Sequence, residues 1–192
     1  MSNPMFKFED AQRMQCKASI MIEGLPGKGK TGLALLIGYY LSGQDWKKVF
    51  HIDTENKSAN LFVDIPASDG QKFGHFKVGQ LTSDIGFKPT NFIAFREAAI
   101  AAGAEVVIKD SISHAWQYKG GVLDILNDAK AKDSRYAKDS YAAWGDPEVV
   151  KEKNELLNLI RDHRAHVITT VRVKEKMEYV PGEDGKMKLQ SL

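Results

Sequence analysis

The sequence has little of what secreted, membrane-spanning or strongly charged proteins need. Its single cysteine, Cys16, cannot form a disulfide within the chain, so we expect a reducing, cytoplasmic location. No apolar run approaches the roughly 20 residues that span a bilayer, and residues 1–10 lack the apolar centre of a signal peptide, so no membrane partner is expected. The formal net charge is only +2, so any binding of nucleic acid must depend on local patches.

The composition and the pattern of apolar residues indicate one domain of ordinary size. Hydrophobic residues make up 43% of the 192 residues, which is enough to form a core. Apolar runs alternate with helical patterns, and this alternation is typical of a mostly parallel sheet flanked by helices. We therefore predict a single α/β domain over residues 1–192, in which residues 1–16 form an N-terminal extension.

The pattern places the individual elements. Strands are expected at residues 18–23, 49–53, 76–78, 105–108 and 166–171. Helices are expected at residues 30–41, 57–63, 91–102, 113–130 and 147–163. Thr90 and Asp146 are candidate N-caps of the helices that follow them. The last helix is expected to bury Leu156, Leu157 and Ile160.

Two polar stretches stand apart from these elements. Residues 131–145 are mixed in charge and are predicted to form a mobile loop. Residues 172–189 are predicted to form a β-hairpin around Pro181–Gly185.

The most informative motif is a complete G-x-x-x-x-G-K-[ST] phosphate-binding loop, which predicts ATP binding. It lies between an apolar run that ends at Ile22 and another that begins at Leu33, the strand–loop–helix context that the motif needs. Lys30 would contact the β- and γ-phosphates, and the hydroxyl of Thr31 would bind Mg²⁺. The predicted nucleotide-binding residues are Gly24, Leu25, Pro26, Gly27, Lys28, Gly29, Lys30, Thr31 and Gly32.

A second acidic position follows the strand expected at 105–108. Asp110 at the end of this run could hold Mg²⁺, partly through water, opposite Thr31. Lys109 interrupts the apolar pattern of the strand, and the alternative is an ordinary Asp-Ser turn.

Candidate catalytic groups end two other strands. Glu55 could orient the attacking water, with Asp53 as its supporting partner, although two solvated acids are the simpler interpretation. Thr170 and Arg172 could sense the γ-phosphate, and Arg172 or Lys174 could reach a neighbouring subunit's nucleotide. Strand threonines and surface arginines are common, so both roles compete with a purely structural one. The five histidines show no metal-binding spacing and are interpreted as structural or surface residues.

Taken together in this order, the phosphate loop, the Asp53–Glu55 segment, the Asp110 strand end and the run from His166 resemble the RecA-like P-loop (AAA-type) ATPases of bacteriophages linked to single-strand annealing recombination. The resemblance covers about residues 20–189. It implies ATP and Mg²⁺ as cofactors, Glu55 as the catalytic glutamate, and action on single-stranded DNA in recombination, annealing or replication. For a phage-encoded protein the compartment would be the bacterial host cytoplasm.

The resemblance also implies partners. Relatives contact DNA through loops at the places of residues 131–145 and 172–188 and assemble as rings or filaments, so a homo-oligomer is expected, with a single-strand-binding protein as a further partner. The corresponding DNA-contact candidates are Lys132, Arg135, Lys138, Lys174, Lys176, Lys186 and Lys188. The alternative is a small-molecule or nucleotide phosphotransferase of the P-loop kinase type, and a non-enzymatic ATP switch is a third interpretation.

Overall fold

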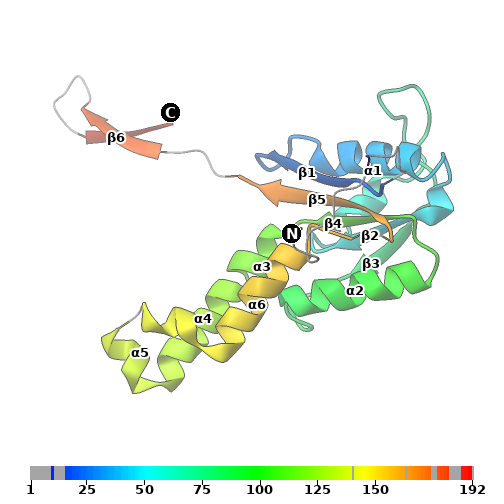
Figure 1. The fold of residues 1–192 in the computed structure, drawn as a ribbon. Helices are drawn as coiled ribbons and strands as arrows, with labels where there is room; N and C mark the ends of the chain where they lie inside the picture. Colours follow the sequence, from blue (N-terminus) through cyan, green and yellow to red (C-terminus); the bar gives the residue numbers. More distant parts are fainter. Residues whose placement is uncertain are drawn as a thin grey trace.

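A five-stranded, all-parallel sheet forms the centre of the computed structural model (Figure 1). The structure describes residues 10, 16–139, 141–162, 164–173, 177–181 and 187–191; of residues 137, 138, 177–181 and 187–191 it describes the backbone only. The strand order is β1-β5-β4-β2-β3. The strands are β1 (Ser19–Gly24), β2 (Val49–Asp53), β3 (Lys77–Gln80), β4 (Val106–Asp110) and β5 (His166–Arg172). The predicted α/β class and parallel sheet are confirmed.

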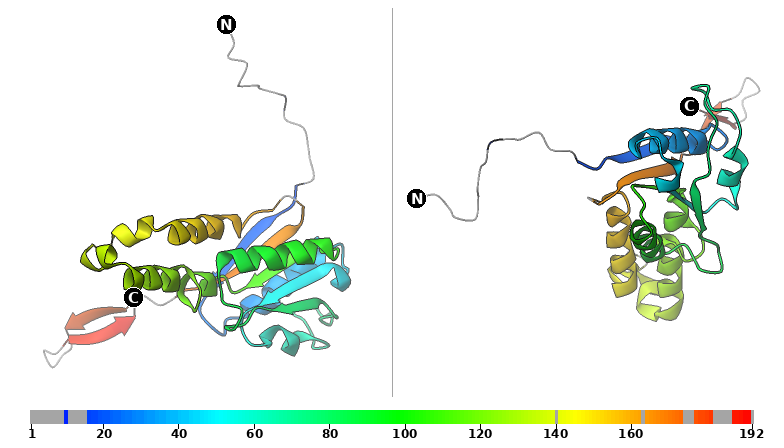
Figure 2. Two further views of the ribbon diagram at one scale, coloured as in Figure 1. Left: turned by 90° about the horizontal axis from the view of Figure 1, so that it is seen from below. Right: turned by 90° about the vertical axis from the view of Figure 1, so that its right-hand side faces the viewer.

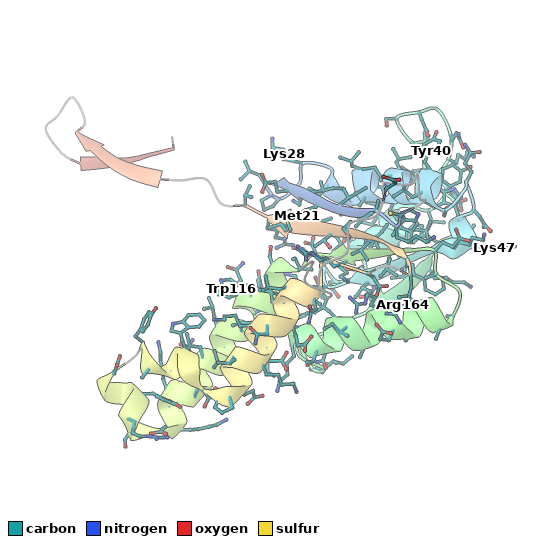
Figure 3. The ribbon with its side chains drawn as sticks, viewed as in Figure 1. Met21, Lys28, Tyr40, Lys47, Trp116 and Arg164 are labelled. Atoms are coloured by element: carbon teal, nitrogen blue, oxygen red, sulfur yellow. The ribbon has the colours of Figure 1, made fainter. Side chains whose placement is uncertain are left out.

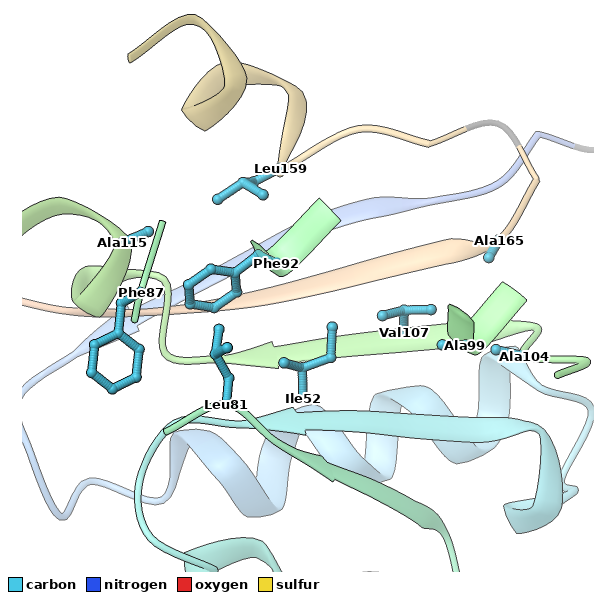
Figure 4. Packing of buried hydrophobic residues seen from close by; sticks show 10 residues of the cluster. All are labelled: Ile52, Leu81, Phe87, Phe92, Ala99, Ala104, Val107, Ala115, Leu159 and Ala165. Atoms are coloured by element: carbon cyan, nitrogen blue, oxygen red, sulfur yellow. The ribbon is translucent and has the colours of Figure 1, made fainter. Parts of the chain in front are cut away.

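Helices cover both faces of this sheet. Helix α1 (Lys30–Leu41) lies on one face, and α2 (Pro89–Ala101) lies on the other beside α6 (Pro147–Asn158) (Figure 2). Strand β4 serves both layers, because successive side chains of a strand point to opposite faces. Its Val106 and Ile108 pack in the cluster beneath α1, and Val107 packs in the cluster beneath α2 (Figure 4).

The helix expected at residues 113–130 is interrupted. It divides into α3 (Ser113–Gln117) and α4 (Val122–Lys132). Gly120 between them has a φ of +77°, in the left-handed region that favours glycine. A Cβ on Gly121 would lie 2.8 Å from the carbonyl oxygen of His114, so the chain passes too close to α3 for any side chain there. The Gly-Gly pair therefore ends one helix and begins the next.

The prediction that residues 131–145 form a loop is wrong, because helical turns occupy most of this stretch. Helix α4 continues to Lys132, α5 spans Ser134–Lys138, and the 3₁₀ turn η3 spans Ala142–Gly145. Asp133 caps α5 by accepting a hydrogen bond from the backbone N–H of Arg135 at 2.9 Å. A small apolar cluster then joins this segment to α4 and α6 through residues that include Ile125, Ala143 and Val149. Of these three, Ala143 lies within residues 131–145, and its burial shows that the charges around it do not mark a solvated loop.

Helix α6 starts as predicted and ends early. Asp146 caps it, accepting from the backbone N–H of Glu148 at 2.9 Å, but the helix ends at Asn158 rather than residue 163. Leu157 is 68% exposed, so its predicted burial is wrong. Thr90 does not cap α2, whose N-cap is Lys88; its hydroxyl instead donates to the buried carboxylate of Glu152 at 3.0 Å.

Lys109 has a structural role that explains its place in an apolar strand. Its side chain is fully buried, and its Nζ donates to the carbonyl oxygen of Leu159 just after α6. Nη1 of Arg96 donates to the carbonyls of Asn158 and Arg161 at 2.9 and 3.0 Å. The last carbonyls of a helix have no partner within it, so these two side chains satisfy the end of α6. Burial, together with repulsion from Arg96, lowers the pKa of Lys109 to about 7, and a neutral amine still donates.

The remaining elements are short. Besides η3, the described residues form the 3₁₀ turns η1 (Trp46–Lys48) and η2 (Ser58–Phe62), the second in place of the helix expected at residues 57–63. Strands β6 (Met177–Pro181) and β7 (Met187–Ser191) pair antiparallel, which confirms the predicted hairpin, although its turn lies outside the described residues. Over the described part of the chain, every helix is too short or too polar to cross a bilayer.

Candidate nucleotide-binding and catalytic site

The phosphate-binding loop joins the carboxyl end of β1 to the start of α1. Gly27 and Gly29 have φ values of +74° and +77°, so the loop turns through conformations that other residues rarely adopt. Nζ of Lys30 lies within the curve of the loop, donating to the carbonyls of Gly24 and Leu25 at 3.0 and 2.9 Å. Lys28 is exposed on the outside of the loop (Figure 3). The loop thus presents backbone N–H groups, a helix N-terminus and an ammonium group to one anion site.

Asp110 joins this loop to the centre of the sheet. It is 1% exposed; its Oδ2 accepts from the hydroxyl of Thr31 at 2.5 Å, and its Oδ1 accepts from the hydroxyl of Thr170. Strand β5 lies between β1 and β4, so Thr170 is placed between the other two residues. The two residues predicted to bind Mg²⁺ are therefore in direct contact.

His51 is a neighbour of Asp110 that sequence reasoning missed. Its Nε2 lies 3.6 Å from Asp110 Oδ2, and neither ring nitrogen has a hydrogen-bond partner within the described residues. Burial raises the pKa of Asp110, but the contacts with His51, Thr170 and Thr31 outweigh it and hold that pKa at about 2. Asp110 is therefore a carboxylate at neutral pH. Its partner could have been found only from the pairing of β2 with β4, which the sequence does not show.

The donor set fits Mg²⁺ bound together with phosphate. Mg²⁺ prefers oxygen ligands and is commonly held by one or two carboxylates plus the phosphates of a substrate. Asp110 supplies a carboxylate and Thr31 a hydroxyl at the opening of the loop. Among the described residues no group of three acidic, histidine or cysteine side chains could hold a metal ion alone. Phosphate oxygens of a nucleotide, together with water, would complete the coordination.

The segment after β2 carries Glu55 and is held firmly. The Asp53 carboxylate is fully buried, accepts from the backbone N–H of Glu55 at 2.6 Å, and accepts from Nε2 of Gln80 at 3.2 Å. The backbone N–H of Thr54 donates to the carbonyl of Asp110 at 2.8 Å. Asp53 is therefore not a solvated acid, and it fixes the turn on which Glu55 lies.

Arg172 lies against Glu55 of the same chain. Its Nη2 and Nε lie 2.6 and 2.7 Å from Glu55 Oε1. Its backbone N–H donates to the hydroxyl of Ser113 at 2.9 Å, which fixes the end of β5. The structure thus brings Glu55 and Arg172 together, and their catalytic roles stay predictions, as does any contact of Arg172 with a neighbouring subunit.

The DNA-contact candidates are only partly described. Lys132 is exposed at the end of α4, while Arg135 is paired with Asp133 at 2.6 Å. Both lie in the helical arm of α4 and α5, away from the sheet (Figure 1). The positions of Lys174, Lys176 and Lys186, and the side chains of Lys138 and Lys188, lie outside the described residues.

Comparison with known proteins places the chain in a family. A comparison with curated proteins gave no match. A family model described as an AAA domain matches residues 16–191, nearly the whole sequence and the whole of the site described above. The chain therefore belongs to the AAA-domain family of nucleotide-binding P-loop ATPases.

Proposed function

We propose that the protein hydrolyses ATP with Mg²⁺ and couples this hydrolysis to single-stranded DNA in phage recombination, annealing or replication. The observation that carries the ATPase part is the contact between Thr31 and the buried, ionised Asp110 beside the phosphate loop. Glu55 and Arg172 lie at the same carboxyl end of the sheet. In parallel α/β proteins this is where ligands bind.

Each side chain has a distinct part in the proposed reaction. Lys30 and the loop N–H groups bind the β- and γ-phosphates, and Thr31 and Asp110 hold the metal ion. Mg²⁺, when bound, neutralises charge on the phosphate oxygens. Glu55 orients a water molecule toward the γ-phosphate, and Arg172 beside it supplies positive charge where negative charge develops. Thr170 keeps the Asp110 carboxylate in place.

The DNA part is supported by the sequence resemblance and by the composition of the C-terminal segment. Lys174, Lys176, Lys186 and Lys188 lie within 15 residues of sequence, the last of them in strand β7. Clustered lysines bind the phosphate backbone without regard to sequence. We further propose a ring or filament of identical subunits, in which the β6–β7 hairpin contacts the strand and Arg172 or Lys174 faces a neighbouring site.

The decisive experiment measures ATP turnover alone, with single-stranded DNA and with double-stranded DNA, beside the protein's mass with an ATP analogue. We expect faster turnover with single strands and a mass above that of a monomer. Lys30→Ala, which removes the cation facing the phosphates, should lack turnover under every condition and so excludes a contaminating ATPase. A monomer whose turnover ignores DNA would contradict the proposal and favour the phosphotransferase, which a search for a phosphorylated acceptor would then test.

A further inference from the structure

A cavity lies beside the candidate catalytic residues, at the carboxyl ends of β2 and β3. It has a volume of about 310 Å³ and is lined by residues that include Thr54, Asn56, Gln80, Phe87, His114 and Tyr118. This volume is near the lower end of the roughly 300–1,000 Å³ typical of small-molecule sites. The cavity is therefore large enough for a single ring-shaped group, and it does not include the phosphate loop.

The walls of the cavity are tied together by the backbone. The N–H of Phe87 donates to the carbonyl of Lys119 at 2.9 Å, and the N–H of Gly86 donates to the carbonyl of Thr82 at 3.0 Å. The first bond joins the loop after β3 to the segment after α3, and the second closes a turn within that loop. Backbone hydrogen bonds therefore hold the walls of the cavity in place, in addition to side-chain packing.

The lining excludes charged ligand groups. Among the described residues, no lysine, arginine, aspartate or glutamate side chain lines the cavity; its polar groups are hydroxyls, amides and the imidazole of His114. Burial, and then repulsion from Arg172, lowers the pKa of His114 to about 4, so this imidazole is neutral at pH 7. A phosphate would have no cation to pair with in this lining, and an ammonium group no carboxylate. An uncharged ligand group with hydrogen-bond donors and acceptors therefore fits this lining.

Three aromatic rings pack against one another along one wall of the cavity, and Tyr118 is the one exposed to a ligand. The ring centroid of His114 lies 5.1 Å from that of Phe87 and 4.1 Å from that of Tyr118, and the rings meet at angles of 47° and 65°. Phe87 and His114 are buried, while Tyr118 is 43% exposed at the mouth. Aromatic faces beside neutral hydrogen-bonding groups are the pattern by which proteins hold unpaired bases.

The cavity is also joined to the catalytic residues. The hydroxyl of Thr54 accepts from the backbone N–H of Ser111 at 2.8 Å and lies 2.5 Å from Nδ1 of His114. Gln80, in the cavity wall, donates to Asp53, and Asn56 directly follows Glu55. A ligand that contacts Gln80 or Asn56 therefore acts on the two ends of the turn that carries Glu55.

We propose that this cavity binds one uncharged nucleobase and that its occupation adjusts the position of Glu55. The base belongs to a single strand of nucleic acid, and this part rests on the proposed function; a free nucleoside presents the same chemistry. Contact with a base would then raise ATP turnover through the Asp53–Asn56 turn, independently of the phosphate contacts of the hairpin.

The test compares two strands that differ only in their bases. Affinities are measured by fluorescence anisotropy, with an ATP analogue present, for an oligothymidylate and for an abasic strand of the same length. Tyr118→Ala should weaken binding of the oligothymidylate about 10-fold and leave binding of the abasic strand unchanged. Tyr118→Phe keeps the ring and should behave as the parent. Tyr40→Ala removes another exposed tyrosine, from the end of α1 (Figure 3), and should have no effect.

Ser83→Trp provides a second variant, because Ser83 is exposed at the mouth of the cavity and a large ring there fills it. Thermal unfolding verifies that both variants fold. If both retain the parent's preference for strands with bases, the proposal is overturned.

Binding of free thymidine tests the nucleobase site independently of the proposed action on DNA. If the parent binds no oligonucleotide, the DNA function fails. Binding of thymidine detected by NMR saturation transfer, and abolished in Ser83→Trp, would still support the cavity as a nucleobase site. If the parent protein binds neither the oligonucleotides nor free thymidine, the proposal of a nucleobase site is overturned.

Discussion

Arg172 and Glu55 form an ion pair at the carboxyl end of the sheet although they are 117 residues apart in the chain. Two guanidinium nitrogens approach the same carboxylate oxygen at 2.6 and 2.7 Å, and the side chains are 29% and 21% exposed. Both side chains keep some contact with water, so we expect the charge of a bound γ-phosphate to redirect one of the two partners.

Glu55→Gln should lower ATP turnover by roughly 10²-fold while ATP·Mg²⁺ still binds, because an amide cannot orient water as a base does. Turnover at saturating ATP and equilibrium binding of a fluorescent ATP analogue test the two parts separately. Glu155→Gln, on α6, is the matched control. Unchanged turnover would show that Glu55 is not catalytic.

Arg172→Ala should also lower turnover, and Arg172→Lys should not restore it, because the single nitrogen of a lysine cannot reproduce the contact of two guanidinium nitrogens with Glu55 Oε1. The ion pair with Glu55 lies within one chain, so mixing Arg172→Ala with Glu55→Gln subunits should give no recovery of activity. That result would leave Lys174 as the residue that faces a neighbouring site. Recovery in the mixture would instead assign Arg172 to the site of a neighbouring subunit.

Asp110→Asn should raise the Mg²⁺ concentration needed for half-maximal turnover by roughly 10- to 100-fold, since the variant loses one carboxylate charge near the metal. A Mg²⁺ titration at saturating ATP measures the shift. Asp128→Asn removes an exposed carboxylate from α4 and should leave the titration where it is. An unshifted curve for Asp110→Asn would limit that residue to a structural role.

Lys109→Met should change the pH dependence of stability. The pKa of Lys109 falls from 10.5 to about 7 on folding, so between these values the unfolded chain binds more protons than the folded one. Lys109 therefore makes the free energy of unfolding rise as pH increases from about 7 to about 10. Urea unfolding across this range should show the parent gaining stability relative to Lys109→Met, since all other titrating groups are shared. Parallel curves would contradict the lowered pKa.

Neutralising the hairpin lysines should weaken binding of single-stranded DNA and flatten its salt dependence, by about 0.7 in slope for each phosphate that the hairpin no longer neutralises. Affinity is measured at several salt concentrations. The substituted lysines are Lys174, Lys176, Lys186 and Lys188. An equal removal of charge elsewhere, at Lys47, Lys72, Lys77 and Lys153, serves as the control. If both sets weaken binding equally, the effect comes from net charge, and the hairpin is not the contact surface.

Much of the fold could be predicted because its signals are local. The phosphate loop determines where β1 ends and where α1 begins, and α1 has the predicted bounds of Lys30–Leu41. Asp146 followed by Pro147 marks the start of α6, because an acidic cap and a proline at the first position are both helix-start signals. The carboxyl ends of parallel strands meet, so the order of motifs also placed Glu55, Asp110 and Arg172 at one end of the sheet.

The rest depended on contacts that are distant in sequence. Lys109 interrupts a strand pattern because its partner, Leu159, lies 50 residues away, and Thr90 bonds to Glu152 rather than capping its own helix. His51 reaches Asp110 only once β2 and β4 are paired. A hydrophobic pattern scores each residue by its neighbours in the chain, so it cannot identify buried polar residues whose partners come from other elements.

The bond from Lys109 to the carbonyl of Leu159 anchors the end of α6 to the strand position immediately before Asp110. Helix α6 also packs against α4, which continues into α5 with Lys132 and Arg135. Any movement of α6 along its axis therefore has to stretch this bond or carry the strand residue next to Asp110 with it.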